Sequence, residues 1–98
     1  MNTSLSTNLE SPNSVPYFLW DEPMTVGELK NKLATASEPE RMRLLGKIMR
    51  EARDRDVWKF TTTLEVKQNW ALLSKHLGRR RAFWKFLFDF WEKEGLIG

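Results

Sequence analysis

The stretch that most constrains this sequence is its last fifth, from Arg79 to Glu94, which carries four phenylalanines, two tryptophans and one leucine without an internal proline or glycine. Gly95 follows it. A glycine just past the last turn is a typical helix C-cap, after which Leu96 can fold back onto the final turn. We therefore predict one helix over about residues 79–94.

The apolar surface of this predicted helix is unusually wide. At about 100° per residue, its apolar side chains cover an arc of roughly 200°, about twice the stripe of an ordinary surface helix. A domain built from about 80 residues buries only about 60% of its unfolded surface. The helix therefore either runs through the middle of its own domain or faces another molecule. The arc is formed by Phe83, Trp84, Phe86, Leu87, Phe88, Phe90 and Trp91.

Three N-capping signals predict the remaining helices. Thr25 and Glu28 form a capping-box pattern that predicts a helix to about residue 34. Ser37, followed by Pro39 in the first turn, begins an amphipathic helix that runs to about residue 53. Thr62 begins a third helix over about 63–70, and residues 71–77 either continue it or form a separate turn. No segment alternates well enough to predict a strand. The expected fold is all-α, a small four-helix domain with short loops.

The first fifteen residues are expected to lie outside this domain. They are rich in Ser, Asn and Thr and carry a single charge, Glu10, which is typical of a disordered leader. The predicted organisation is a leader over residues 1–15 and a single helical domain over 16–98. Pro16 and Pro23 bracket an aromatic segment, which we expect to be extended and to insert its rings into the domain or into a partner.

Chemistry-bearing residues are few. The chain has no cysteine, and His76 is its only histidine, so no metal site, cofactor or catalytic residue is predicted. Ser74 lies two positions before His76, a spacing that points the two side chains apart on a helix. Asp54 and Asp56 indicate a charged turn better than a catalytic carboxylate pair. No run of 18 apolar residues and no secretory signal is present, so we expect no membrane span and a cytoplasmic location.

The densest basic cluster, Arg79 to Arg81, leaves several interpretations open. It is either a solvated helix start, slightly unfavourable against the helix dipole, or a contact to an acidic protein or to nucleic acid. DNA binding through a helix-turn-helix-like pair is the alternative function, although a recognition helix should offer polar side chains to the bases rather than Phe and Trp. A homodimer through the last helix is a third interpretation.

Four segments together resemble a known group of proteins. These are the Pro16–Asp21 opening, the helix end at Arg50–Arg53, the Asp56–Phe60 motif and the Arg79–Trp84 run. The chain resembles small uncharacterised prokaryotic proteins with a proline–aromatic–Leu-Trp-Asp opening, which are often encoded beside AbiEii-type nucleotidyltransferase toxins. The likeness covers about residues 16–92 and transfers no catalytic residue. It implies a non-enzymatic, antitoxin-like protein that binds and neutralises a cognate toxin.

We expect such a toxin to contact an aromatic and arginine surface made by the last helix and the Pro16–Asp21 segment. The expected partner-binding residues are Phe18, Trp20, Trp58, Arg80, Arg81, Trp84, Phe88 and Trp91.

Overall fold

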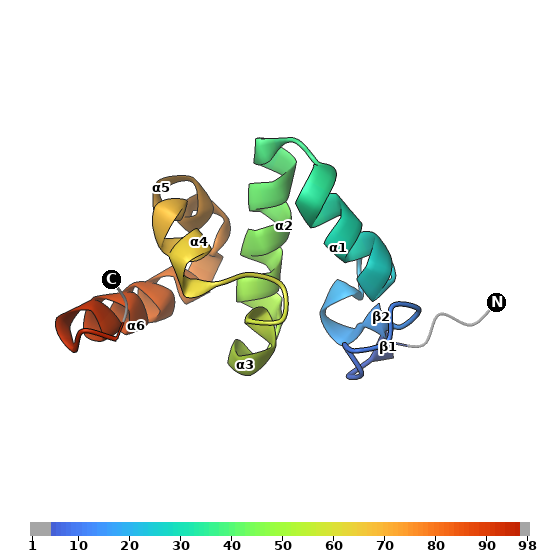
Figure 1. Cartoon of the computed structure of the whole chain (residues 1–98), viewed down its shortest axis with the longest axis horizontal. Helices are drawn as coiled ribbons and strands as arrows, with labels where there is room; N and C mark the ends of the chain where they lie inside the picture. Colours follow the sequence, from blue (N-terminus) through green and yellow to red (C-terminus); the bar gives the residue numbers. More distant parts are fainter. Residues whose placement is uncertain (1–4, 97–98) are drawn as a thin grey trace.

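The computed structural model describes residues 5–96, which form a mostly helical chain with one very short strand pair. Figure 1 shows the arrangement of the elements along the molecule. The all-α prediction is confirmed, but the described residues form six α-helices rather than four. In chain order the elements are β1 (Leu5–Ser6), β2 (Val15–Pro16), the 3-10 turn η1 (Tyr17–Leu19), α1 (Val26–Thr35), α2 (Glu38–Glu51), α3 (Asp54–Val57), α4 (Thr63–Gln68), α5 (Trp70–Leu73), the 3-10 turns η2 (Ser74–His76) and η3 (Gly78–Arg80), and α6 (Arg81–Lys93).

The predicted N-caps begin three of these helices. At α1 the capping box is complete, because the Glu28 N–H donates to the Thr25 hydroxyl (3.1 Å) and the Thr25 N–H donates to the Glu28 carboxylate (2.8 Å). Ser37 and Thr62 each accept a backbone N–H from the third helical residue of α2 and α4. These side chains satisfy N–H groups that have no partner inside the helix.

The extra helices arise where the predicted ones end early. The chain leaves α2 after Glu51 and makes the single helical turn α3 at Asp54–Val57, the position of the charged turn in the sequence. The expected helix over 63–70 breaks at Asn69, where the backbone (φ −107°, ψ 14°) departs from helical values, and α5 follows. Gly78 has a positive φ of 54°, which glycine adopts without steric cost, and it separates η2 from the start of the last helix.

Helix α2 is the centre of the core. In Figure 1 this helix lies between α1 and the N-terminal segment on one side and α4, α5 and α6 on the other, and its buried apolar side chains belong to the core cluster that all these parts share. At Gly46 the backbone of α2 lies against η2, where a Cβ atom would come within 2.3 Å of the His76 Cβ. The buried apolar residues of α2 are Met42, Leu44, Leu45, Ile48 and Met49.

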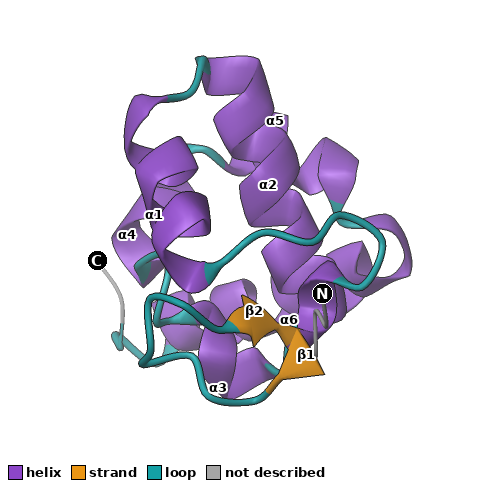
Figure 2. Cartoon of the chain, turned by 90° about the vertical axis from the view of Figure 1, so that its right-hand side faces the viewer, coloured by secondary structure: helices purple, strands orange, loops and turns teal. Residues whose placement is uncertain are grey.

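The N-terminal segment differs from the expected leader. β1 pairs in parallel with β2, with Leu5 opposite Val15, and Leu9 is buried (Figure 2). Residues 5–15 are therefore part of the fold, because their few apolar side chains find partners that are distant in sequence. Residues 1–4 of the expected leader lie outside the described residues. The aromatic segment is also not extended beyond Pro16, since residues 17–19 form the turn η1.

Polar contacts of two side chains, Tyr17 and Lys47, fix this segment to the core. The Tyr17 hydroxyl donates to Asp56 Oδ2 (2.7 Å) and accepts the Arg53 N–H (2.7 Å). The buried ammonium of Lys47 on α2 pairs with Asp21 and also reaches Glu22 at 3.4 Å. A buried charge is strongly unfavourable without such a partner, so the acidic residues after η1 have a structural role here.

The molecule is elongated, with extents of 48 × 26 × 22 Å. In Figure 1, α6 lies at one end of the long axis and the N-terminal segment at the other, with α2 between them. Figure 2, viewed along this axis, has β1 and β2 in front. Across residues 5–96, no helix has both the length and the apolar character needed to cross a membrane.

Candidate functional site

Helix α6 attaches to the core through one of its faces. Trp84 and Phe88 are buried, and the Trp84 indole N–H donates to the Met49 carbonyl (2.9 Å). Trp58 packs edge-to-face on Trp84 with ring centroids 5.8 Å apart, and Trp70 lies 6.2 Å from Phe88. These contacts hold the helix by aromatic packing and one buried hydrogen bond.

A second face of α6 points into solvent although it is aromatic. Phe83 is 37% exposed, Phe86 67% and Phe90 47%. Their spacing of three and four residues places them on one side of the helix, and the rings of Phe86 and Phe90 stack with centroids 6.5 Å apart. We call these three residues the phenylalanine face. Large apolar side chains gathered in this way are uncommon on the surface of a small protein.

Charged residues border the phenylalanine face at both ends. At the N-terminal end Arg80 pairs with Asp54 and lies over the Phe83 ring, with its guanidinium carbon 4.4 Å from the ring centroid. Arg79 is exposed at the same end, and Glu94 is exposed at the other. Arg79 and Glu94 thus have opposite charge, and Lys93 in the last turn of α6 is exposed beside Glu94.

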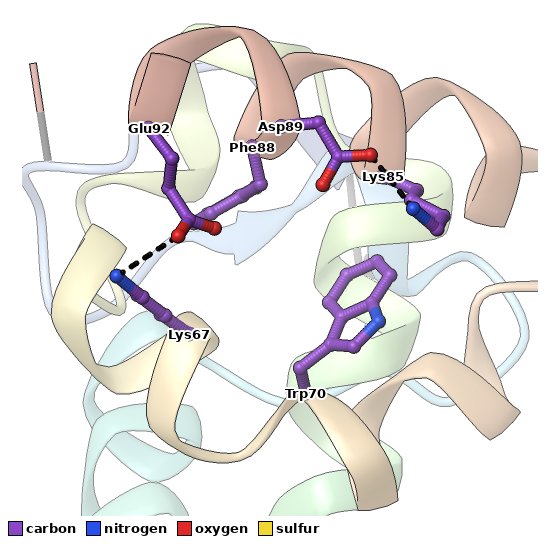
Figure 3. Close-up of a pocket in the computed structure, with 6 residues that line it drawn as sticks. All are labelled: Lys67, Trp70, Lys85, Phe88, Asp89 and Glu92. Carbon is purple, nitrogen blue, oxygen red and sulfur yellow. Dashed lines mark hydrogen bonds and ion pairs between the residues drawn. The ribbon is translucent and has the colours of Figure 1, made fainter. Parts of the chain in front are cut away.

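The third face of α6 closes a groove against α4 and α5. Figure 3 shows Trp70 opposite α6, with Phe88 beside the groove and charged side chains around it. Lys67 pairs with Glu92 across the groove (3.3 Å), and Lys85 pairs with Asp89 along the helix (2.7 Å). The groove has a volume of about 310 Å³. Both carboxylates that line the groove, Asp89 and Glu92, are held in ion pairs.

The expected partner-binding residues divide into three groups. Phe18, Trp84 and Phe88 are buried core residues, so their prediction as surface anchors is wrong in this structure. Trp58 and Trp91 are half-buried and pack against the core. Trp58 contacts the rings of Trp84, Phe88 and Trp91, whereas Phe18 packs against Tyr17 and Phe60. These rings are therefore used for packing inside the monomer.

The other three expected residues are accessible but do not form one surface. Trp20 is 63% exposed, yet its segment lies at the opposite end of the molecule from α6 (Figure 1). Arg80 is engaged with Asp54 and Phe83, whereas Arg81 is exposed. The expected residues therefore do not form one joint surface, and the exposed aromatic side chains that lie together on α6 are those of the phenylalanine face.

Phe83, Phe86 and Phe90 belong to the wide apolar arc of the predicted helix but are not among the expected partner-binding residues. Their i, i+3, i+7 spacing was the available signal. It could not identify the exposed side, because Trp84, Phe88 and Trp91 have a similar spacing and satisfy the same pattern.

The residues of chemical interest are held in structural roles. His76 is half-buried beside Gly46, and its carbonyl accepts from Arg50 (2.8 Å). In the part of the chain from residue 5 to residue 96, no three His, Asp or Glu side chains lie together so that they could hold a metal ion.

Comparison with family models, with curated proteins and with solved structures found no match to this chain. The resemblance to antitoxin-like proteins therefore stays a prediction. A function for this protein has to be inferred from its exposed side chains.

Proposed function

We propose that this protein is a non-enzymatic interaction protein that binds a partner protein on the phenylalanine face of α6. The observation that carries the proposal is the exposure of Phe83, Phe86 and Phe90 on a helix whose opposite face already fills the core. Burying apolar surface contributes a favourable free energy of about 25 cal/mol per Å². A partner that covers the exposed phenylalanines would gain this free energy. Aromatic and arginine side chains are also the residues enriched in protein contacts.

The resemblance gives this proposal a specific form, in which the partner is a cognate nucleotidyltransferase-type toxin. In that form the protein is an antitoxin-like companion that neutralises the toxin by contact. Two mechanisms fit a docked helix. Either α6 blocks the entry of the toxin's substrate, or it holds the toxin in an inactive conformation.

DNA binding is the second candidate function, and one observation favours it. No acidic residue occurs between Glu65 and Asp89, and Lys75, Arg79 and Arg81 are exposed within that span. Against it, the accessible side chains along α6 include three phenylalanines, which cannot hydrogen-bond to base edges. If these three cations contact three phosphates, affinity should fall about 40-fold between 50 and 200 mM salt. Binding through the phenylalanine face should change far less.

Co-purification with the tagged full-length chain of the toxin that the resemblance implies, the product of an adjacent gene, tests the main proposal. The informative variant is F86S/F90S, which removes the most exposed part of the phenylalanine face and leaves Trp84 and Phe88 in the core. The matched control is W20S, because Trp20 is about as exposed as Phe86 but belongs to the Pro16–Asp21 segment, which lies on the other side of α2 from α6 (Figure 1). We expect wild type and W20S to retain the partner and F86S/F90S to lose it.

Two outcomes would oppose the proposal. Retention of the partner by F86S/F90S at the wild-type level would show that the phenylalanine face is not the contact. Loss of the partner only in W20S would indicate that the partner binds the Pro16–Asp21 segment instead. Far-ultraviolet circular dichroism of each variant checks that the fold is intact.

A further inference from the structure

The phenylalanine face has a near-palindromic order along the helix. Phe83 and Phe90 lie at equal distances in sequence from the point between Phe86 and Leu87, and so do Arg79 and Glu94. At about 100° per residue, Leu87 and Glu94 fall within about 40° of Phe83, so they border the same face. Leu87 is half-buried and joins this face to the core. The three phenylalanines and Leu87 therefore keep the same order from either end, and Arg79 and Glu94 beyond them have opposite charge, whereas Arg80 and Lys93, the next pair inward, are both basic.

We propose that in the free protein a second copy of the chain covers this surface, with the two α6 helices packed antiparallel about a two-fold axis near Phe86 and Leu87. This inference rests on the proposed function, since it takes the phenylalanine face to be a contact surface and names an occupant for it. A two-fold interface uses the same patch on both copies. Here Phe83 meets Phe90 of the second copy, and the Phe86 rings meet near the axis.

Charge decides the direction of the pairing. The antiparallel arrangement places Arg79 of each copy beside Glu94 of the other, and it opposes the two helix dipoles. A parallel arrangement would bring Arg79 beside Arg79 and the remaining arginines of the two helix starts close together. Like charges across an interface are unfavourable, so the antiparallel pair is the self-complementary one.

The size of the surface predicts a weak, reversible dimer. The exposed parts of the three phenylalanines equal about one and a half rings, or roughly 300 Å² per copy, when each ring buries about 150–250 Å². Together with Arg79, Leu87 and Glu94, the contact extends along a helix of about 20 Å. This is below the ~800 Å² per partner of a standard stable interface, so association should depend on concentration in the micromolar range.

Sedimentation of the full chain over about 1–500 μM tests the inference. We expect the mass to rise from that of the 11.6 kDa monomer towards twice that value, and F86S/F90S to remain monomeric throughout. R79E alone and E94R alone should each weaken the dimer about tenfold, because each replaces two exposed ion pairs by two repulsions. The double variant R79E/E94R should recover wild-type association, since it restores both pairs in the reverse sense.

Other outcomes separate this inference from the proposed function. A wild-type chain that stays monomeric at the highest concentration would overturn the dimer, even if F86S/F90S still lost its toxin-like partner. Failure of R79E/E94R to recover association would overturn the antiparallel arrangement. A dimer with unchanged toxin capture by F86S/F90S would support self-association and refute the proposed function. Circular dichroism again checks that each variant is folded.

Discussion

Trp84 and Phe86 lie two positions apart on α6 and should respond very differently to truncation. Trp84 is fully buried, and its indole N–H donates to the Met49 carbonyl. Replacing a buried Trp by Ala typically destabilises a protein by about 3–5 kcal/mol, because burial is lost and a cavity remains. The Met49 carbonyl also loses its partner, which increases the loss within that range. For a chain of 98 residues, this is a large part of the total stability of about 5–15 kcal/mol.

Phe86→Ala should change stability very little. Phe86 is 67% exposed, so only about one third of the ~2–3 kcal/mol available from full burial is realised in the folded monomer. Its stacking on Phe90 adds about 0.2–0.5 kcal/mol. Alanine has a better helix propensity than phenylalanine, which stabilises the variant by about half a kcal/mol. The net change should therefore be below about 1 kcal/mol.

Urea denaturation followed by circular dichroism at 222 nm measures both variants, since this signal comes mainly from the helical backbone and the transition midpoint does not depend on its amplitude. It should be performed at low protein concentration so that self-association does not stabilise either form. The reasoning predicts a difference of at least about 2 kcal/mol between W84A and F86A. Equal losses for the two variants would refute the assignment of a core face and a solvent face to α6.

Three further changes test the rest of the fold. G46A should destabilise by about 1–3 kcal/mol in urea denaturation, because the new methyl meets His76; a gain of about 1 kcal/mol, as helix propensity alone predicts, would contradict this close contact. G95A should lose about 1 kcal/mol in the same assay, since Gly95 has a φ of 72°, and an unchanged midpoint would argue against this helix end. The pKa values of Asp21 and Glu22 are lowered by hydrogen bonds from Lys47 and Arg43, respectively. Because the folded pKa values lie below the unfolded ones of about 3.9 and 4.3, this stabilisation is present above about pH 5 and lost as the pH falls through the folded values. The urea midpoint should therefore drop between about pH 5 and pH 3, and a flat profile would count against these pairs.

The local signals in the sequence were sufficient for the three helix starts marked by capping residues and for the end of the last helix. The capping box at Thr25 depends only on residues three positions apart. The C-terminal glycine also acts as predicted. Gly95 donates its N–H to the Glu92 carbonyl (3.1 Å), and the N–H of Leu96 reaches back to the Trp91 carbonyl (2.8 Å). Such contacts close within one helical turn, so the sequence contains all the partners they need.

The N-terminal segment shows where local information was insufficient. Leu9 lies among polar residues that indicate disorder, yet it is buried against distant parts of the chain. The same holds for Lys47, whose partner Asp21 belongs to a segment separated from it by all of α1. Composition averages over neighbours in sequence, whereas burial depends on neighbours in space.

By itself, the sequence determined that the last helix has more apolar circumference than an ordinary surface helix, and where that helix ends. Only the tertiary structure decided which side of this helix packs in the core. Trp58 and Trp70, contributed by other segments, lie beside Trp84 and Phe88 and bury them. Phe83, Phe86 and Phe90 remain in solvent because nothing in residues 5–96 covers that side fully. The physical reason is that helical periodicity assigns side chains to a face, but only the placement of other segments decides whether that face is buried.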